Sequence, residues 1–297
     1  MKPNINQIKE SKTILELLEF SIINLDKPAG PTSFGVDEIM KKILDVNKAA
    51  HFGTLDPNVT GVLPVSLNRA CRLMHYFIGK NKEYVGIMKL HKETDEKTLK
   101  EEIKNFIGKI IQLPPKKSRV KREERERSVF NFEILEFNKE NKEVLFKTEV
   151  EAGTYIRKLI HDLGKSLGGA HMSELRRTKA SIFSEQDKNF TNLYQLEEAI
   201  KEYKRGNEKK LREILIPGEI TADILPAIQV KEEAIKKLYN GSPLFQEFLQ
   251  EEKQSKNLPE IFAIFHKDIF IGTYKKANEG NIIAWPEFVL RPDKKPK

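Results

Sequence analysis

The stretch HFGTLDPNVTGVLP, residues 51–64, places one acidic residue, Asp56, among two glycines and two prolines. Pro57 biases the backbone of Asp56 toward an extended conformation, because the proline ring clashes with a helical residue before it. Gly53 and Gly61 permit close approach of another backbone or of a ligand. A carboxylate held rigidly in such a loop suits nucleophilic or general-base chemistry. The alternative is an Asx-type turn in which Asp56 binds nearby amides, and the local pattern leaves both open.

The composition predicts a folded intracellular protein with an anionic partner. A chain of 297 residues with 39% hydrophobic residues can form one large domain plus a small one. Lys and Arg outnumber Asp and Glu by 52 to 44, a net charge of +8 that favours a polyanion, although thermal adaptation raises both charge types. The single cysteine, Cys71, excludes an intrachain disulfide and a multi-cysteine metal site. No apolar leader or membrane-length apolar run is present, so we expect no membrane contact.

Strand and helix patterns mix without a regular βαβ order in the first two thirds of the chain. This mixture predicts an α+β domain with a mostly antiparallel sheet. The expected elements are a strand before the turn at 28–31, a helix from Thr32 or Ser33 to Leu44 with Ile39 on its apolar face, a strand at 83–90, a helix at 98–108, an antiparallel strand pair at 129–137 and 143–150, and a helix at 156–168.

A smaller β-rich unit follows the proline- and glycine-containing stretch at 215–226. We expect two domains, at 20–215 and 222–297, and residues 1–19 are candidates for joining the second. The expected elements of the second unit are a helix at 231–241 and short strands at 261–266, 269–274, 282–285 and 288–292.

Arg157 and Tyr84 are the next candidates for chemistry. Arg157 lies in GTYIRKLIHDLG, where a strand gives way to a helix among apolar neighbours, and an arginine there needs an anionic partner. Asp56 and Asp162 are the candidate partners, and a purely structural ion pair is the alternative. Tyr84 begins a strand, where it can stack on a base and present its hydroxyl, although core packing is the commoner role of such a tyrosine.

Two basic segments are candidates for contact with RNA phosphates, and a solvated surface is the alternative for both. The loop at 114–128 carries seven cations against three anions, and LRRTK at 175–179 is the second cluster. The cations of the loop are Lys116, Lys117, Arg119, Lys121, Arg122, Arg125 and Arg127. The six histidines show no metal-ligand spacing and no phosphate-binding glycine motif occurs, so we predict neither metal nor cofactor.

Five segments in order, NLDKPAGPTS, HFGTLDPNVTGVLPV, KEYVGIMKLH, EAGTYIRKLIHDLG and GAHMSELRRT, resemble the TruB-type pseudouridine synthases. Within that family they resemble the dyskerin-like catalytic subunit of archaeal and eukaryotic box H/ACA guide-RNA particles. The resemblance covers nearly the whole chain. It implies an α+β pseudouridine synthase domain followed by a C-terminal PUA domain, and a cofactor-free isomerisation of uridine in rRNA or tRNA.

The resemblance also implies roles for single residues. Asp56 would act at the ribose C1′ of a flipped uridine, Tyr84 would stack on the base and take part in proton removal, and Arg157 would orient Asp56. Around them, Lys27 and Pro28 would brace the loop, His51 would lie near the flipped nucleotide, and Leu175 would lie beneath the base. The candidate RNA-binding cations are Lys117, Arg119, Lys121, Arg122, Arg176 and Arg177.

The dyskerin-like pattern implies that a guide RNA selects the substrate RNA, with the PUA unit holding the 3′ ACA end of the guide. It implies a zinc-ribbon-like subunit, a glycine/arginine-rich-type subunit and a kink-turn-binding protein attached through RNA, in the cytoplasm of an archaeal-type cell. Guide-independent action on the TΨC arm of tRNA is the alternative. A silent RNA scaffold would require loss of Asp56, Tyr84 or Arg157, and all three are present.

The places where the chain departs from the family pattern include four single positions. Ala50 stands where glycine is usual, and Phe52 stands where a small residue is usual. Arg119 replaces the alanine of the commoner SAVKR, and Ser181 occupies a common glycine position.

Overall fold

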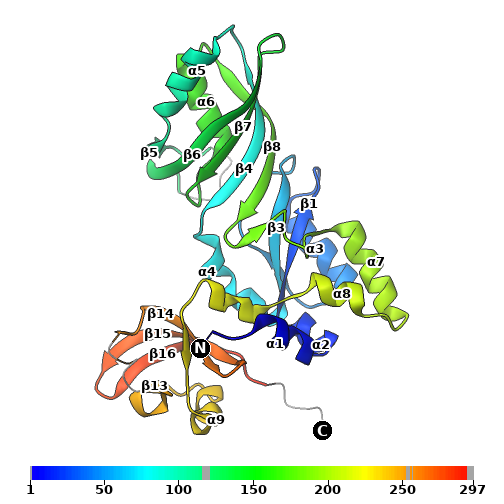
Figure 1. Ribbon diagram of the computed structural model, residues 1–297, viewed down its shortest axis with the longest axis vertical. Coiled ribbons are helices and arrows are strands. Elements are labelled where there is room, and N and C mark those ends of the chain that lie inside the picture. The colour runs from blue at the N-terminus through cyan, green and yellow to red at the C-terminus, as the bar shows by residue number, and fades with distance from the viewer. Residues whose placement is uncertain (1, 116–120, 252–254, 256, 293–297) are drawn as a thin grey trace.

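The computed structural model describes residues 2–115, 121–251, 255 and 257–292. A long sheet with helices on its flanks forms the upper and central part, and a smaller sheet lies below it (Figure 1). Among the described residues the large sheet has eleven strands, with the principal order β10-β1-β3-β8-β4-β7-β6-β5. Most pairs are antiparallel, and β1–β10 and β3–β8 are parallel. The predicted α+β class is therefore confirmed.

The strands of the large sheet are β1 (Ser21–Lys27), β2 (Ala49–His51), β3 (Thr60–Leu67), β4 (Lys82–Leu90), β5 (Gly108–Gln112), β6 (Arg125–Asn138), β7 (Glu143–Val150), β8 (Ala170–Ala180), β9 (Phe183–Ser184), β10 (Thr191–Asn192) and β11 (Ile216–Pro217). The helices of this part are α1 (Ile5–Ser11), α2 (Ile14–Glu19), α3 (Ser33–Leu44), α4 (Met74–Ile78), α5 (Glu96–Lys104), α6 (Ile156–Ser166), α7 (Leu193–Lys204) and α8 (Lys209–Ile214), with 3-10 turns η1 (Asn68–Leu73) and η2 (Gly218–Asp223).

Helix α3 begins as predicted, because the side chain of Thr32 accepts the backbone N–H of Gly35 and caps the first turn. Met40 and Leu44 are buried on the side that faces the core. Ile39, expected on the same face, is instead 38% exposed. It lies about 100° around the helix from Met40, beyond the edge of the buried stripe.

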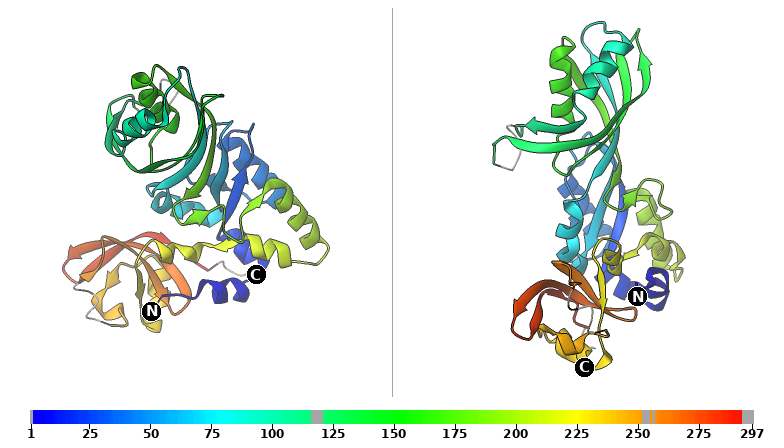
Figure 2. Two further views of the ribbon diagram at one scale, coloured as in Figure 1. Left: turned by 45° about the horizontal axis from the view of Figure 1, so that its top comes forward. Right: turned by 60° about the vertical axis from the view of Figure 1, so that its left-hand side comes forward.

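Helix α6 packs on β8 with the apolar face that its spacing predicted. Ile156, Leu159, Ile160 and Leu163 are all buried. Figure 2 shows α5 and α6 on the same side of the upper strands. The sequence periodicity therefore placed this helix correctly.

Three predicted boundaries are wrong. The helix expected at 98–108 ends at Lys104, and Gly108 begins β5 with a φ of +100°. The basic loop expected at 114–128 ends earlier, because Arg125 already pairs with Gln112 as the first residue of β6. The strands expected at 282–285 and 288–292 form one strand, β16.

The second sheet contains β12 (Ala227–Gln229), β13 (Leu244–Phe245), β14 (Ile261–His266), β15 (Ile269–Glu279) and β16 (Ile282–Val289), in the order β12-β14-β15-β16-β13. The helix expected at 231–241 consists of a 3-10 turn, Glu232–Ala234, followed by α9 (Ile235–Tyr239), and a further 3-10 turn covers Gln246–Phe248.

The two sheets share buried side chains at their junction. Phe20 stacks on Phe270 with ring centroids 5.4 Å apart, and one hydrophobic cluster includes both residues. The hydroxyl of Tyr76 donates to Thr273 or Glu287, at 2.8 and 2.7 Å. The N-terminal helices lie beside this junction in Figure 1. Among the described residues, no helix is both long and apolar enough to cross a membrane.

Candidate active site

The loop between β2 and β3 carries Asp56 at the surface of the central sheet. The Oδ2 atom of Asp56 lies 2.9 Å from Nη2 of Arg157, the second residue of α6. Their side chains are 55% and 63% exposed, so a ligand can reach both. Asp162, the other candidate partner of Arg157, pairs instead with Lys158 and Lys165. The structure therefore places Asp56 and Arg157, which are far apart in the sequence, side by side.

Lys27 fixes the Asp56 loop through hydrogen bonds to its backbone. Its buried Nζ donates to the carbonyls of Pro28, Pro57 and Val59 at 2.9, 2.9 and 3.1 Å. Burial lowers the pKa of Lys27, and the negative charge of Asp56 acts in the opposite direction. One ammonium thus joins the end of β1 to both sides of the loop, which is the bracing role that the resemblance implies.

Ser33 fixes the residue before Asp56 and was not predicted to do so. Its hydroxyl accepts the N–H of Leu55 at 2.9 Å and lies 3.0 Å from the Leu55 carbonyl, to which it donates. The sequence suggested Ser33 only as an alternative helix cap, and Thr32 has that role. The first turn of α3 therefore positions the backbone that carries the carboxylate.

His51 lies at the start of the loop, where Asp37 of α3 holds it. Nδ1 of His51 is 2.6 Å from Oδ2 of Asp37, and Nε2 is 3.2 Å from the Thr54 hydroxyl. Asp37 is buried and was not among the predicted residues. Its place five residues after the cap of α3 gave no distinct signal in the sequence.

Gln112 fixes the turn that precedes Arg157. Its side-chain oxygen accepts the Tyr155 N–H at 3.0 Å, and its amide nitrogen donates to the Tyr155 carbonyl at 3.2 Å. Gln112 is buried at the end of β5 and lies 43 residues from Tyr155 along the chain. Sequence reasoning missed this contact because no local pattern joins the two segments.

Tyr84 and Leu175 lie in neighbouring strands beside the loop. In the β4–β8 register Tyr84 faces Arg177 and Gly86 faces Leu175, so these four positions share one side of the sheet. Tyr84 is 7% exposed, and Leu175 is also buried. A Cβ added to Gly86 would lie 2.8 Å from Cδ1 of Leu175, so the glycine leaves the space that Leu175 fills.

Arg176 and Arg177 were predicted to bind RNA, but in the structure both side chains bind other groups of the protein. Arg176 forms two hydrogen bonds with Asp26, at 2.9 and 3.1 Å, and a third with Glu185 at 2.7 Å. Arg177 is 1% exposed and therefore cannot reach RNA phosphates. Only Arg177 is buried, because consecutive residues of β8 point to opposite faces of the sheet, and the Arg176 side chain stays 36% exposed.

Gly61 makes room for β8 and not for a ligand. A Cβ added here would lie 2.2 Å from the Arg177 carbonyl oxygen, and the residue has a φ of +98°. Gly53 also has a φ of +98°, and its added Cβ would face Lys82 and Arg177. The two glycines thus let the loop lie directly on the sheet.

The basic loop is described only in part. Lys117 and Arg119 lie outside the described residues. Lys121 and Arg122 are exposed, and Lys121 pairs with Glu123 at 2.9 Å. Both exposed cations remain available for a phosphate contact.

Two departures from the family pattern have structural explanations. Phe52 is buried and stacks on Phe77 with ring centroids 4.9 Å apart, so a large side chain fills the space beneath β2. Ser181 has a φ of +59°, which explains why glycine is common there. Ala50 pairs with Ser66 in the β2–β3 ladder, and nothing in the structure explains the choice of alanine over glycine.

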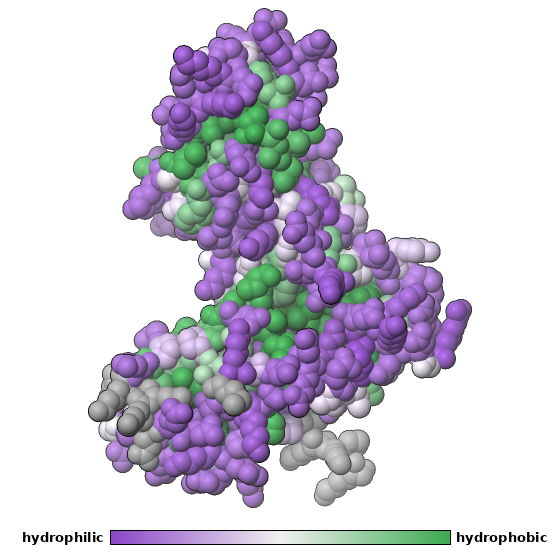
Figure 3. All heavy atoms as spheres, in the orientation of Figure 1, coloured by the Kyte–Doolittle hydropathy of each residue, from purple (hydrophilic) through white to green (hydrophobic). Residues whose placement is uncertain are grey.

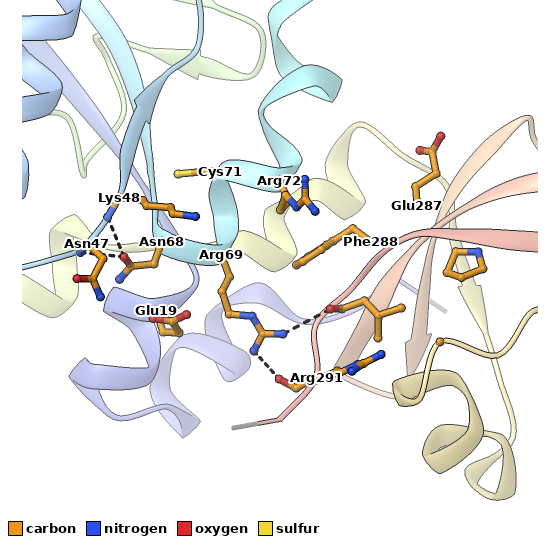
Figure 4. Close-up of a pocket in the computed structure, with 13 residues that line it drawn as sticks. Glu19, Asn47, Lys48, Asn68, Arg69, Cys71, Arg72, Glu287, Phe288 and Arg291 are labelled. Carbon is orange, nitrogen blue, oxygen red and sulfur yellow. Dashed lines mark hydrogen bonds between the residues drawn. The ribbon is translucent and has the colours of Figure 1, made fainter. Parts of the chain in front are cut away.

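A cavity of about 670 Å³ lies at the junction of the two sheets and not at Asp56. Figure 4 shows Lys48, Arg69, Arg72 and Arg291 around it, together with Asn47, Asn68 and the acidic Glu19 and Glu287. Arg69 donates to the carbonyls of Arg291 and Val289 and so ties η1 to the end of β16. The cations exceed the acids, which suits an anionic ligand. Sequence reasoning missed this site because its cations are scattered along the chain.

The part of the chain that the structure describes has no group of three or more His, Cys, Asp or Glu side chains arranged to hold a metal ion.

Two family models match most of this chain. The TruB family pseudouridylate synthase N-terminal domain matches residues 41–156, and the tRNA pseudouridylate synthase B C-terminal domain matches residues 157–222. A probable tRNA pseudouridine synthase B of Methanopyrus kandleri is 39% identical over 97% of this chain and 88% of its own length. One of Pyrococcus furiosus is 45% identical over 79% of this chain and 69% of its own length.

Solved structures agree with these matches. A Cbf5–Nop10–Gar1 complex contains a chain with 38% identity and a TM-score of 0.85, covering 95% of this chain and 88% of that one. An archaeal box H/ACA Nop10–Cbf5 complex gives 36% identity and a TM-score of 0.83, covering 97% and 92%.

The α+β fold is thus that of an RNA pseudouridine synthase. The chain belongs to the TruB family of pseudouridylate synthases, isomerases that act on RNA, and its structure matches archaeal, dyskerin-like Cbf5.

Proposed function

We propose that this protein isomerises uridine to pseudouridine in rRNA or tRNA as the catalytic subunit of a box H/ACA guide-RNA particle. The observation that carries the proposal is the accessible Asp56–Arg157 pair on a loop clamped by Lys27. The structural match over 95–97% of the chain to proteins solved in H/ACA complexes supports the subtype.

The geometry suits an extruded nucleotide. A uridine stacked in a helix is out of reach of the Asp56 carboxylate, so it must be flipped out at a cost of a few kcal/mol. Asp56 then acts at C1′ while Arg157 holds the carboxylate. The N1–C1′ bond breaks, the base rotates, and a C5–C1′ bond forms. C5 loses a proton and N1 gains one, so the reaction balances without an oxidant or reductant.

Tyr84 and Leu175 form the side of the site that receives the base. Leu175 gives an apolar floor and Tyr84 gives a ring for stacking, and the Tyr84 oxygen takes part in removal of the C5 proton. Their shared side of the sheet supports this division of roles. His51, held by Asp37, stands where the neighbouring nucleotides leave the stack.

Guide RNA would bind across both sheets. The basic cavity at their junction and the exposed Lys121 and Arg122 supply phosphate contacts, and the unit at 222–297 acts as the PUA domain that holds the ACA end. A solved H/ACA particle bound to a substrate RNA has a chain that is 36% identical over 96% of this one, with a TM-score of 0.83, which favours this arrangement.

Small protein subunits would cover the upper part of the molecule. Figure 3 shows hydrophobic surface on the part formed by α5 and the strands around it. Exposed apolar side chains there include Ile107, Ile111, Phe130 and Leu135. We place the zinc-ribbon-like and glycine/arginine-rich-type subunits on this catalytic portion, with the kink-turn-binding protein attached through RNA.

Guide-independent modification of the TΨC arm is the second candidate. The curated relatives are named tRNA pseudouridine synthase B, which favours it. The two functions differ in their requirement for a guide.

The test incubates the purified protein with a TΨC-arm transcript and, separately, with a guide RNA, its matched substrate and the partner subunits. We expect full activity only where the guide is present. Equal activity on the tRNA arm alone would refute guide dependence, and absence of pseudouridine in both reactions would refute the enzymatic assignment.

A further inference from the structure

Arg177 is a buried cation whose side chain forms two hydrogen bonds with backbone carbonyls. Its Nε donates to the Val62 carbonyl at 2.7 Å and its Nη2 to the Gly53 carbonyl at 3.0 Å. These carbonyls lie on either side of Asp56, so Arg177 spans the two ends of the catalytic loop. Tyr84 is the registered partner of Arg177 in the β4–β8 ladder, so its ring lies beside the Arg177 side chain.

The charge of Arg177 is not balanced by a carboxylate. Within the described ranges, no Asp or Glu forms an ion pair with it, whereas neighbouring Arg176 has two such partners. Burial lowers the pKa of Arg177, and a negative charge on Tyr84 opposes that effect. Lys82 adds a second cation on this side of the sheet, beside Gly53 and close enough to Arg177 to feel its charge.

The strand register explains why these two side chains meet. Tyr84 of β4 and Arg177 of β8 are Cα partners on the same side of the sheet, and both are buried. Neither side chain can turn away without leaving the core. The pair is therefore built into the sheet and does not depend on a mobile loop.

We propose that Arg177 is a positioning residue that lies against Tyr84 in the sheet and stabilises negative charge on the Tyr84 oxygen while Tyr84 removes the uracil C5 proton. This inference rests on the proposed function. Tyr84 first gives its own proton to solvent. The C5–H bond then breaks, its electron pair restores the C5–C6 double bond, and the proton moves to the Tyr84 oxygen. N1 takes up a proton from solvent.

The test compares Arg177→Lys and Arg177→Met in single-turnover reactions of the complete particle, on substrate RNA with hydrogen or deuterium at C5 of the target uridine. We expect Arg177→Met to slow the reaction roughly 10²-fold, the scale of general-base catalysis. Arg177→Lys should recover part of that loss, because it keeps the charge. Both variants should show a primary isotope effect of at least about 2, because proton removal becomes the slow step.

Substrate affinity and the melting temperature separate this role from a structural one. Arg177→Lys should bind substrate RNA within threefold of wild type, and the Arg176→Lys control, whose guanidinium faces Asp26 and Glu185, should show no isotope effect above that of wild type.

Three outcomes would overturn the inference. These are an unchanged rate in Arg177→Lys and Arg177→Met, a slowed rate with no isotope effect, and a loss of rate that only parallels loss of RNA affinity or folding. If Arg177→Met does not fold, Tyr84→Phe must show the same isotope effect with Arg177 in place, and its absence would also overturn the inference. If the wild-type particle forms no pseudouridine, both the proposed function and this inference fail. If the wild type is active and Arg177→Lys and Arg177→Met react at the same rate as it does, only this inference fails.

Discussion

At the scale of single residues, Lys27 shows how a buried charge can determine the shape of a functional loop. Its ammonium is enclosed at the end of β1 and donates to three carbonyls, two of which flank the turn after Asp56. A buried ammonium is costly unless its donors are satisfied. The loop carbonyls satisfy them, so the position of the Asp56 backbone and the stability of the core depend on the same side chain.

We predict that Lys27→Met lowers the free energy of unfolding by about 3 kcal/mol, because three buried carbonyls lose their donor. Activity should fall further than folding alone explains, because the Asp56 loop loses its brace. Urea unfolding and a pseudouridine assay under folding conditions measure both. The control is Lys97→Met on exposed α5, which should change stability by less than 0.5 kcal/mol or so. Equal effects of the two variants would contradict the bracing role.

Part of the site could be predicted from single residues. Asp56, Arg157 and Lys27 stand in distinctive motifs, and the structure brings them together. Ser33 and Gln112 could not be predicted, because they act on backbone groups of segments far away in the chain. The LRRTK cluster was predicted to contact RNA phosphates, and the structure contradicts this for Arg177. A run of cations is typical of a surface, but the burial of Arg177 and the carboxylate partners of Arg176 are visible only after β8 is placed.

At the scale of elements, the approach of β3 to β8 decides where the loop rests. The two strands pair in parallel at only two registered positions, Thr60 with Arg176 and Gly61 with Arg177. Gly61 has the positive φ and the missing Cβ that this contact requires. The sequence predicted a close approach at this glycine but left its partner open.

We predict that Gly61→Ala lowers the free energy of unfolding by more than about 3 kcal/mol, because its Cβ would meet the Arg177 carbonyl at 2.2 Å and the backbone has a positive φ. Gly79→Ala is the matched control, since its added Cβ meets nothing within 4 Å and its φ is −72°. Chemical denaturation measures both. A Gly61→Ala protein as stable as Gly79→Ala would show that the strands do not approach as described.

The junction between α4 and β4 depends on Lys82. Its Nζ donates to the carbonyls of Ile78 and Lys80, at 2.8 and 2.7 Å. Burial first, and then the charge of Arg177, lower the pKa of Lys82 to about 8. The unfolded chain therefore binds more protons than the folded chain between about pH 8 and pH 10.5, so this group makes folding more favourable as the pH rises through that range.

We predict that the stability advantage of wild type over Lys82→Met grows by up to about 3 kcal/mol between pH 8 and pH 10.5. Taking the difference between the two proteins removes the titration of all other shared groups. Urea midpoints measured at half-unit steps of pH give the curve. A difference that is flat or that shrinks with pH would show that the Lys82 ammonium is not buried as described.

At the scale of the whole molecule, the two sheets are packed together at one junction. A shared hydrophobic cluster and the hydroxyl of Tyr76 join them, and the basic cavity opens at the same junction. The prolines and glycine at 215–226 predicted a break in the pattern, and in the structure β11 and η2 occupy this segment. The cavity was not predicted, because it forms only when η1 and β16 meet.

We predict that the double variant Lys48→Ala, Arg72→Ala weakens RNA binding and reduces the slope of log affinity against log salt by about 1.5, because two phosphate contacts are lost. The control is Lys104→Ala, Lys139→Ala at the upper end of the molecule, which has the same charge change and should leave the slope unchanged. Filter binding over a range of salt measures both. Equal slopes for the two double variants would exclude the cavity from RNA contact.

The central claim is that the Asp56 carboxylate performs the isomerisation, and Asp56→Asn tests it most directly. The amide keeps the size of the side chain, which is exposed, so the fold and RNA affinity should be unchanged. Pseudouridine formation at the target uridine, measured in the complete guide-RNA particle with RNA binding measured in parallel, should fall below detection. Pseudouridine formation at an undiminished rate by Asp56→Asn would contradict the account.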